Sequence, residues 1–544
     1  MTNALSFRDT LSVLSKSSSY AVSTESDTST LSGLAKVKSY LYIKTDIEQD
    51  FKDILIGLAS SETQFIFLCG SSGDGKSEIL TRYSSKVVYK SVVDFHLDAT
   101  HSFKPDTNAI TTLNERFHES KLSNRPLVVG INLGMMANYA RGGADEHQEI
   151  RDAMQAHLEG CKPAVDYVFL NFEDKKYAKF EFSGHIAKSP FAKKLMQKLT
   201  AKEYLNEINP FWQAVNTSVE LNQDAKFIAN FRLLAMDAVQ DVIIEALMKA
   251  RLIKDQFMTA RALLDFIYHL LTGPGYLYDN LFSGADNELA RSIAEFDPVA
   301  NRTRKLDEFI LHLKLGQPDS EFNCFNLALN ELGVEGINSS TSYIRLFFLF
   351  RKVVFANDYH KGFAKEFDDK LLEEFAMVHQ AQQYLNKTDP PEQMAKLTDF
   401  YKFKLVPALW RYMNRNAPAL KSKQYLVAEH NDVLVAAEMK FKPDWAAIKA
   451  DSTNSPAFFN VHLQVNGEKL DATPPININL FELLTKLNEG YRPNKHDKSC
   501  VLILDELVEH IHNLMANCET LLFIDNGKAY EVELDQGYIE ATEA

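Results

Sequence analysis

Eight consecutive residues, Gly70-Ser71-Ser72-Gly73-Asp74-Gly75-Lys76-Ser77, match the pattern G-x-x-x-x-G-K-[ST] without a gap. The pattern is typical of a loop that wraps phosphate groups, because backbone N–H groups between small residues can converge on the phosphate oxygens. An apolar run from Phe65 to Cys69 leads into the motif, and a predicted helix from Lys76 to about Ser84 leads out of it. The positive end of that helix dipole would face the phosphates. The sequence therefore predicts a phosphate-binding loop.

Two residues of the motif carry the groups that would hold a nucleotide. We expect the Lys76 ammonium to reach the β- and γ-phosphates of ATP, and the Ser77 hydroxyl to join the coordination shell of Mg²⁺. Asp74 is expected to face solvent. The predicted ATP-binding residues are Gly70, Ser71, Ser72, Gly73, Asp74, Gly75, Lys76 and Ser77.

An acidic residue that completes the magnesium shell is expected at the end of a neighbouring strand. The second predicted strand ends at Leu97-Asp98-Ala99-Thr100, so Asp98 is the best-placed acid, with a turn cap as the alternative role. The third strand, from Leu127, ends at Asn132, a neutral amide that could orient water or sense the γ-phosphate. Glu173-Asp174, after the fourth strand, is a further possibility.

Arg261 is a candidate for a contact from outside the loop. It lies one turn into a predicted helix that Thr259 could initiate, ahead of several apolar residues. An arginine from a helical lid can stabilise charge on the γ-phosphate. An exposed helix arginine explains the same residue.

The elements that must position these residues follow from the hydrophobic pattern. Between residues 45 and 200 short apolar runs alternate with helical stretches, which predicts an α/β P-loop NTPase domain with a mostly parallel sheet. Residues 1–44 form a Ser/Thr-rich lead-in, expected to be extended or partly mobile, with a short strand at Tyr40-Leu41-Tyr42-Ile43. Thr45 is expected to cap the next helix, and Val87 to Leu97 to contain a strand.

Beyond residue 200 the pattern changes twice. Residues 201–420 have apolar positions three to four apart, which predicts a helical lid or middle domain. Residues 421–544 regain strand signals and predict a C-terminal α+β domain, ending in a helix and a hairpin turned at Asp525-Asn526-Gly527. Val501 to Glu506 imitates an apolar strand followed by an Asp-Glu pair, but its apolar spacing favours an amphipathic helix.

Bulk composition limits the class of protein. A chain of 544 residues should fold into about two to four domains. A hydrophobic share of 45% and a charged share of 24% argue against disorder of the whole chain. No apolar run approaches the roughly 20 residues that cross a bilayer, and the N-terminus lacks the apolar core of a signal peptide. With five scattered cysteines, these features predict a cytoplasmic location without membrane partners.

The charge distribution bears on nucleic-acid binding. A net charge of −14 argues against binding DNA by bulk attraction. A local phosphate-facing patch could still form from eight clustered lysines, although solvated faces explain such runs as well. These are Lys175, Lys176, Lys179, Lys188, Lys193, Lys194, Lys198 and Lys202.

Glu438 and Lys440 suggest a second chemistry. They are two residues apart in a predicted strand, so their side chains lie on the same face. Many metal-dependent nucleases place Glu-x-Lys in this way, with an earlier acid as a second metal ligand. Asp432 is the only nearby acid and its spacing is poor. A metal-dependent nuclease is therefore the weaker alternative, and a solvated ion pair explains the same residues.

Several segments together resemble the DptF family, also called DndF, of DNA phosphorothioation-dependent restriction proteins. The resemblance extends over nearly the whole chain. The phosphate loop is the one motif in it with independent mechanistic meaning. The segments are Leu11-Ser12-Val13-Leu14-Ser15-Lys16-Ser17-Ser18, the loop Gly70 to Glu78, His96-Leu97-Asp98-Ala99-Thr100, Gly130-Ile131-Asn132-Leu133-Gly134 and Thr259-Ala260-Arg261-Ala262-Leu263-Leu264-Asp265-Phe266.

The resemblance implies a role in bacterial defence. Members of this family act with two companions, DptG and DptH, to restrict DNA that lacks the sulfur-for-oxygen backbone mark of the host. The chain would be an ATP-binding and ATP-hydrolysing subunit of that complex, with DNA contacted through the complex. The missing acid after the third strand weighs against vigorous hydrolysis by the chain alone. A non-catalytic, nucleotide-gated scaffold that orders partner proteins is the alternative.

Overall fold

The computed structural model of the chain divides into two compact units. The first unit comprises Met1–Glu181 and Lys188–Asp368, and the second comprises Phe182–Ala187 and Asp369–Ala544. The predicted boundary at residue 420 thus falls inside the second unit. The described residues are 6–17, 33–58, 63–100, 108–161, 166–177, 179–184, 186–255, 258–284, 286–385, 390–418, 420–430, 433–451, 455, 457–515, 520–525, 528–535 and 538–543.

A four-stranded parallel sheet, in the order β2-β3-β1-β4, lies in the first unit. Because all four strands run in one direction, their carboxyl ends share one edge of the sheet. The strands and their helices are α3 (Asp46–Gly57), β1 (Phe65–Gly70), α4 (Lys76–Ser84), α5 (Val87–Lys90), β2 (Asp94–His96), α6 (Ala109–Ser123), β3 (Leu127–Asn132), α7 (Leu133–Gly142), η4 (Asp145–His147), α8 (Gln148–Leu158), β4 (Tyr167–Asn171) and η5 (Lys175–Tyr177).

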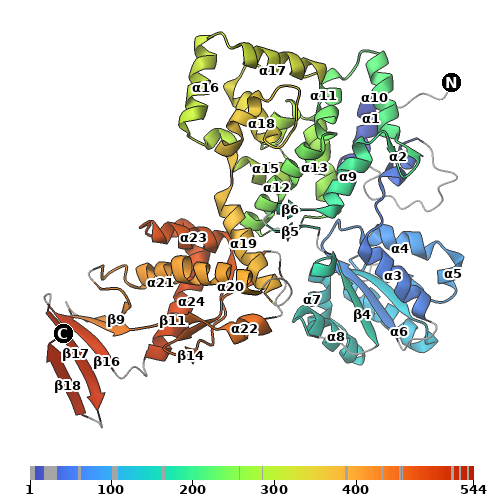
Figure 1. Cartoon of the computed structure of the whole chain (residues 1–544). Coiled ribbons are helices and arrows are strands. Elements are labelled where there is room, and N and C mark those ends of the chain that lie inside the picture. The colour runs from blue at the N-terminus through green and yellow to red at the C-terminus, as the bar shows by residue number, and fades with distance from the viewer. Residues whose placement is uncertain are drawn as a thin grey trace. The chain divides into compact units, whose positions relative to one another are not determined.

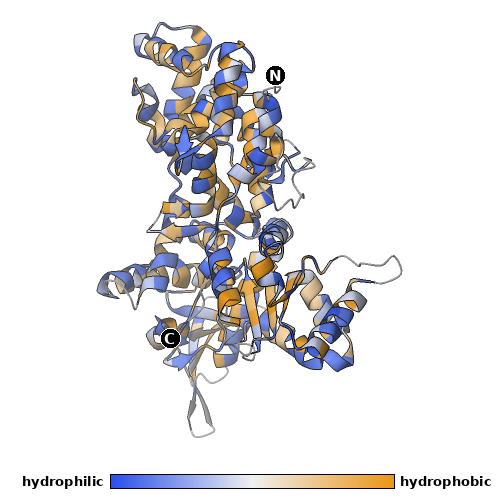
Figure 2. Cartoon of the chain, turned by 90° about the vertical axis from the view of Figure 1, so that its right-hand side faces the viewer, coloured by the Kyte–Doolittle hydropathy of each residue, from blue (hydrophilic) through white to orange (hydrophobic). Residues whose placement is uncertain are grey.

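Helices cover both faces of this sheet (Figure 1). On one face, residues of α3 and α4 such as Phe51 and Leu80 pack on Ile66 and Leu68 of β1. On the other face, α6, α7 and α8 pack on the remaining β1 side chains and on alternate β3 residues. All six residues of β1 are buried, and Figure 2 shows the sheet strands as a hydrophobic layer. Burial on two faces explains why these strands are continuous apolar runs.

One expected strand proved to be partly helical. Val87–Lys90 forms α5, and only Asp94–His96 forms β2. Val87 and Val88 are 80% and 73% exposed, so their β-branched side chains do not join the sheet. The strand propensity of valine comes largely from packing against a neighbouring sheet surface, and no such surface covers these residues.

Helices form the rest of the first unit, as predicted for the middle of the chain. Between β4 and Asp368, the strands among the described residues form two short hairpins: β7–β8 belongs to the first unit, whereas β5–β6 lies mostly in the segment Phe182–Ala187 of the second unit. The elements are β5 (Glu181–Ser183), β6 (Ile186–Lys188), α9 (Pro190–Thr200), β7 (Glu203–Tyr204), β8 (Glu207–Ile208), α10 (Pro210–Glu220), α11 (Ala225–Leu234), α12 (Asp237–Lys254), α13 (Ala260–Thr272), α14 (Leu277–Asn280), α15 (Glu288–Ala294), η6 (Pro298–Ala300), α16 (Arg304–Leu315), α17 (Ser320–Glu331), α18 (Ser340–Phe350) and η7 (Tyr359–Phe367).

The described part of the N-terminal lead-in is helical, not extended. It forms α1 (Phe7–Leu11), η1 (Ser12–Leu14) and α2 (Leu34–Leu41). Phe7 is fully buried, and its ring meets Phe231 edge-on at 5.5 Å. The predicted strand at Tyr40 is wrong, since Tyr40 lies in the last turn of α2 and its hydroxyl donates to the Lys198 carbonyl at 2.8 Å. Tertiary contacts of this kind override a short apolar signal.

The second unit combines helices with small antiparallel sheets. Its largest sheet has the order β18-β17-β16-β10-β9. The elements are α19 (Lys370–Tyr384), α20 (Pro390–Asp399), a π-helical turn η8 (Phe400–Leu405), α21 (Val406–Met413), β9 (Gln424–His430), β10 (Val433–Glu438), β11 (Phe441–Pro443), α22 (Trp445–Ala450), β12 (Phe458–Asn460), β13 (Leu463–Val465), β14 (Glu468–Lys469), β15 (Pro475–Asn477), α23 (Ile478–Asn488), η9 (Lys495–Asp497), α24 (Lys498–Met515), β16 (Thr520–Asp525), β17 (Lys528–Asp535) and β18 (Tyr538–Glu543).

The C-terminal predictions agree with these elements in outline. Val501 to Glu506 lies within α24, as its apolar spacing predicts. The predicted hairpin is confirmed, because β16 and β17 pair antiparallel, while its turn residues Asn526 and Gly527 lie outside the described residues. The structure thus has a small parallel sheet among helices and separate antiparallel sheets, compatible with α/β and α+β parts.

Candidate phosphate-binding site

The loop Gly70–Ser77 connects the buried strand β1 to the amino end of α4. Gly70, Gly73 and Gly75 have φ angles of 150°, 91° and 103°, a region that favours glycine. Space is also restricted at Gly73, where a Cβ would lie 3.1 Å from the Arg261 Cβ and 3.2 Å from the Thr259 Oγ1. A Cβ on Gly70 would lie 2.9 Å from the Phe172 Cβ. The glycines are therefore required by backbone conformation and, at Gly70 and Gly73, by close neighbours.

Lys76 lies across this loop. Its Nζ donates to the carbonyl oxygens of Gly70 at 3.0 Å and Ser71 at 2.7 Å. Among the described residues these carbonyls are its hydrogen-bond acceptors, so one of the three ammonium N–H groups remains for an anion. Burial lowers the pKa of Lys76, and the nearby Asp74 carboxylate opposes that shift. Ser77, next in α4, is exposed and presents its hydroxyl at the helix amino end.

Asp74 does not face solvent, which corrects the prediction made for it. Its side chain is 5% exposed and forms an ion pair with Lys179. Its Oδ2 accepts the Ser71 N–H at 2.7 Å. Lys179 follows β4 and lies 105 residues away along the chain. The loop is thus held from within by a buried carboxylate that a distant lysine neutralises.

Two polar residues lie at the carboxyl ends of β3 and β2, on one side of β1. Asn132 lies opposite Gly70 in the parallel register and caps α7, with its Oδ1 accepting the Met135 N–H at 2.6 Å. Asp98 follows β2, one strand further out, and its Oδ1 accepts the Thr100 N–H at 2.9 Å and hydroxyl at 2.6 Å. Burial lowers the pKa of Lys76, and the Asp98 charge, like that of Asp74, opposes this lowering.

Glu173 follows β4 and makes a direct contact with the loop. Its Oε1 accepts a hydrogen bond from the Ser71 hydroxyl at 2.8 Å. Burial raises the pKa of Glu173, and the Ser71 hydrogen bond opposes that shift. Glu173 was only a further possibility from the sequence, because the end of a strand does not reveal which strand lies beside β1.

A close approach of β2 to β3 fixes the position of Asp98. The Ala99 N–H donates to the Gly130 carbonyl at 2.8 Å. A Cβ on Gly130 would lie 2.5 Å from the Leu97 carbonyl oxygen, which is far too close. Gly130 therefore lets the chain segment that carries Asp98 lie against β3.

The start of α13 contacts the loop through its backbone. The Arg261 N–H donates to the Gly73 carbonyl at 3.2 Å, and Thr259 caps α13 by accepting the Ala262 N–H at 3.2 Å. The capping role predicted for Thr259 is confirmed, whereas the expected Thr45 side-chain cap of α3 is not formed. The Arg261 side chain is exposed. The backbone of Arg261 therefore contacts the loop, and among the described residues its guanidinium has no hydrogen-bond partner in the loop.

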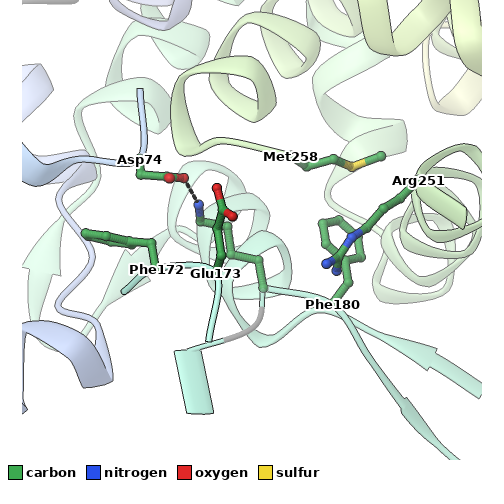
Figure 3. Close-up of a pocket in the computed structure, with 7 residues that line it drawn as sticks. Asp74, Phe172, Glu173, Phe180, Arg251 and Met258 are labelled. Atoms are coloured by element: carbon green, nitrogen blue, oxygen red, sulfur yellow. Dashed lines mark hydrogen bonds and ion pairs between the residues drawn. The ribbon is translucent and has the colours of Figure 1, made fainter. Parts of the chain in front are cut away.

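A small pocket lies beside the loop, next to Glu173. Its apolar walls come from Phe172, Phe180 and Met258, and its polar groups from Asp74, Glu173, Lys179 and Arg251 (Figure 3). Burial lowers the pKa of Arg251, while the Asp255 and Glu173 charges oppose the shift. Lys179, Arg251 and Met258 carry no local sequence signal that links them to the loop.

The other sequence candidates are not brought to this site. Glu438 and Lys440 lie in the second unit with exposed side chains, and Asp432 lies outside the described residues. In the described part of the chain, no group of three or more His, Cys, Asp or Glu side chains could hold a metal ion. Within the lysine run, Lys176 pairs with Asp50, Lys193 pairs with Asp241, and Lys198 donates to the Tyr42 carbonyl. Several lysines of this run are therefore already engaged within the protein by ion pairs or hydrogen bonds.

His96, at the end of β2, gives the fold near Asp98 a pH dependence. The side chain is 1% exposed, and burial lowers its pKa to about 4, against about 6.5 in an unfolded chain. Above about pH 6.5 the ring is neutral in both states. As the pH falls from there towards 4, the unfolded state binds the proton first, so the free energy of unfolding decreases.

We therefore expect His96 to lower the free energy of unfolding by about 2 kcal/mol between about pH 7 and pH 5. Urea unfolding of the wild type and of His96→Gln at both pH values measures this difference. His118→Gln, which removes an exposed histidine of α6, is the control. An equal pH dependence in wild type and His96→Gln would contradict the assignment.

In comparisons with known proteins, no family model, curated protein or solved structure matches the chain. Across the described residues, none of the helices combines the length and apolar character that a membrane span requires.

Proposed function

We propose that this chain binds ATP together with Mg²⁺ and hydrolyses it. The observation that carries the proposal is the loop itself, in which the Lys76 ammonium is fixed by two carbonyls at the amino end of α4. Glycines in the left-handed region allow the loop N–H groups to turn towards a bound anion. The charge of the ammonium and the helix dipole both favour a polyphosphate at this position.

We propose roles for the groups around the loop in binding a triphosphate and a metal ion. The exposed Ser77 hydroxyl is the proposed ligand of Mg²⁺, and Asp98 is the carboxylate proposed for the metal's water shell. When bound, Mg²⁺ would neutralise charge on the phosphate oxygens. Asn132 is proposed to orient water through its side-chain NH₂ group, because its Oδ1 is used by the Met135 N–H. Arg261, at the start of α13, is proposed to approach the terminal phosphate.

The wider role is proposed from the resemblance to the DptF family. The chain would be the P-loop ATPase subunit of a cytoplasmic, phosphorothioation-linked restriction complex. Its partners would be DptG-like and DptH-like proteins, and DNA would be contacted through the complex. The acidic balance of the chain supports indirect contact, since a net charge of −14 disfavours an extended DNA-binding surface.

Phosphate release separates hydrolysis from mere binding. We expect the wild type to release phosphate from Mg-ATP, and Asp98→Asn to lower the rate by about a hundredfold with little change in ATP affinity. Asp94→Asn, which removes an acid at the other end of β2 with 45% of its side chain exposed, should retain the wild-type rate. A wild-type rate in Asp98→Asn would contradict the role given to Asp98.

The same assay decides between an ATPase and a nucleotide-gated scaffold. It is run with the chain alone and then with the partner proteins and unmodified DNA. Binding of Mg-ATP without phosphate release in either case would overturn the ATPase proposal in favour of the scaffold.

A further inference from the structure

A lysine outside the loop lies close to the amino end of α4. The Nζ of Lys38, in α2, is 3.8 Å from the Glu78 Oε2, and 28% of the Lys38 side chain is exposed. Glu78 directly follows Ser77 in the first turn of α4. The N–H groups of that turn point out of the amino end of the helix, where the proposed phosphates would lie. Lys38 therefore lies beside the part of α4 that a polyphosphate would approach.

The helix that carries Lys38 is anchored to another helix of the same unit. Val37 and Tyr40, which flank Lys38 in α2, are buried. The Tyr40 hydroxyl donates to the Lys198 carbonyl at 2.8 Å, and the Lys198 ammonium donates to the Tyr42 carbonyl at 3.0 Å. These two hydrogen bonds tie α2 to α9. Because the backbone is fixed in this way, Lys38 loses little further freedom when its ammonium binds an anion.

Positive charge is gathered around Lys38. Its nearby carboxylate, Glu78, is shared, because the Glu78 Oε1 accepts a hydrogen bond from the Arg82 Nε at 2.9 Å. Burial lowers the pKa of Lys38, the Glu78 charge opposes that shift, and the positive charges of Arg82 and Arg261 add to it. The charges with the largest effect on Lys38 are thus one carboxylate and two cations. Such an excess of positive charge attracts an anion.

Arg261 connects this group of charges to the loop. Its N–H donates to the Gly73 carbonyl at 3.2 Å, and its Cβ would lie 3.1 Å from a Cβ on Gly73. The start of α13 therefore lies against the loop, while the first turn of α4 follows the loop directly. Positive charges from α2 and α13 consequently lie beside the loop, although neither helix belongs to its motif.

From this arrangement we propose that Lys38 is a further nucleotide-binding residue, whose ammonium contacts a phosphate oxygen of the polyphosphate at the amino end of α4. The inference rests on the proposed phosphate-binding function of the loop. The Lys38 contact with Glu78, at 3.8 Å, is longer than a hydrogen bond. A phosphate oxygen would replace it with a charge-assisted hydrogen bond, which is stronger, and Glu78 would keep its bond from Arg82.

Inorganic triphosphate tests this contact, because it has the phosphates of ATP but no nucleoside. The experiment is a calorimetric titration of the full chain with Mg-ATP and with magnesium triphosphate. We expect Lys38→Met to weaken the binding of both ligands about tenfold, the effect of losing one charge-assisted hydrogen bond. Lys38→Gln provides a second variant with the same expectation. Lys38→Arg keeps the positive charge and should bind both ligands within about threefold of the wild type.

Lys36→Met, which removes an exposed lysine of the same helix, is the matched control and should bind both ligands as the wild type does. Unchanged triphosphate affinity in Lys38→Met would overturn the inference, because a loss confined to ATP would place Lys38 on the nucleoside. Equal weakening in Lys38→Met and Lys38→Arg would overturn it as well, since lost packing would then explain the effect. Both of these results leave phosphate binding by the loop intact. Failure of the wild type to bind either ligand would refute the proposed function and this inference with it.

Discussion

Replacement of Lys76 by alanine should lower the affinity for Mg-ATP by more than about a hundredfold, the equivalent of about 3 kcal/mol. The substitution removes the cation that the Gly70 and Ser71 carbonyls fix across the loop. A charge-assisted hydrogen bond to phosphate would be lost with it, and two carbonyls would be left without their donor. Isothermal titration calorimetry of wild type and variant measures the change.

Lys86→Ala is the matched control, because Lys86 is an exposed lysine just beyond the same helix. It should bind Mg-ATP as the wild type does. Lys76→Ala should unfold at nearly the wild-type temperature, since the buried ion pair of Asp74 is retained. An unchanged ATP affinity in Lys76→Ala would contradict the role of the loop.

The second large effect is expected from breaking the buried pair of Asp74 and Lys179. Their side chains are 5% and 13% exposed. Removing one partner leaves an uncompensated buried charge, which costs about 3–5 kcal/mol. We therefore expect Asp74→Ala to lower the free energy of unfolding by about 3 kcal/mol. ATP affinity should also fall, because the Ser71 N–H loses its acceptor. Urea unfolding and calorimetry measure the two effects.

A double-mutant cycle identifies the source of that loss. Adding Lys179→Met to Asp74→Ala should recover part of the stability, because the unpaired ammonium is then removed as well. Glu295→Ala is the control, since it breaks a pair with Lys254 whose side chains are 55% and 36% exposed. Such a pair contributes about 1 kcal/mol or less. Additive effects of Asp74→Ala and Lys179→Met would contradict a coupled buried pair.

The strands and helices around the loop could be predicted because local patterns determine them. The continuous apolar runs of β1, β3 and β4 are what burial on both faces of a parallel sheet requires. Helix α4 begins and ends where its pattern indicates. The strand expected at Tyr40 and the strand start expected at Val87 failed for opposite reasons. Tyr40 is packed by a distant part of the chain, whereas Val87 is exposed.

From the sequence, the candidate site could be predicted only for the residues that lie at the ends of strands. Asp98 and Asn132 follow the strands on one side of β1, and their nearness to the loop follows from parallel strand order. The orientation of Asp74 could not be predicted, because its partner Lys179 comes from another part of the chain. Arg251 and Met258 reach the pocket through helix packing, which no residue spacing near the loop indicates.

The most direct test of the central claim is a titration of the wild-type chain with Mg-ATP in a calorimeter. The loop geometry predicts saturable binding with one nucleotide per chain, and loss of that binding in Lys76→Ala. No detectable binding at about millimolar nucleotide, a concentration that corresponds to about −4 kcal/mol, would contradict it.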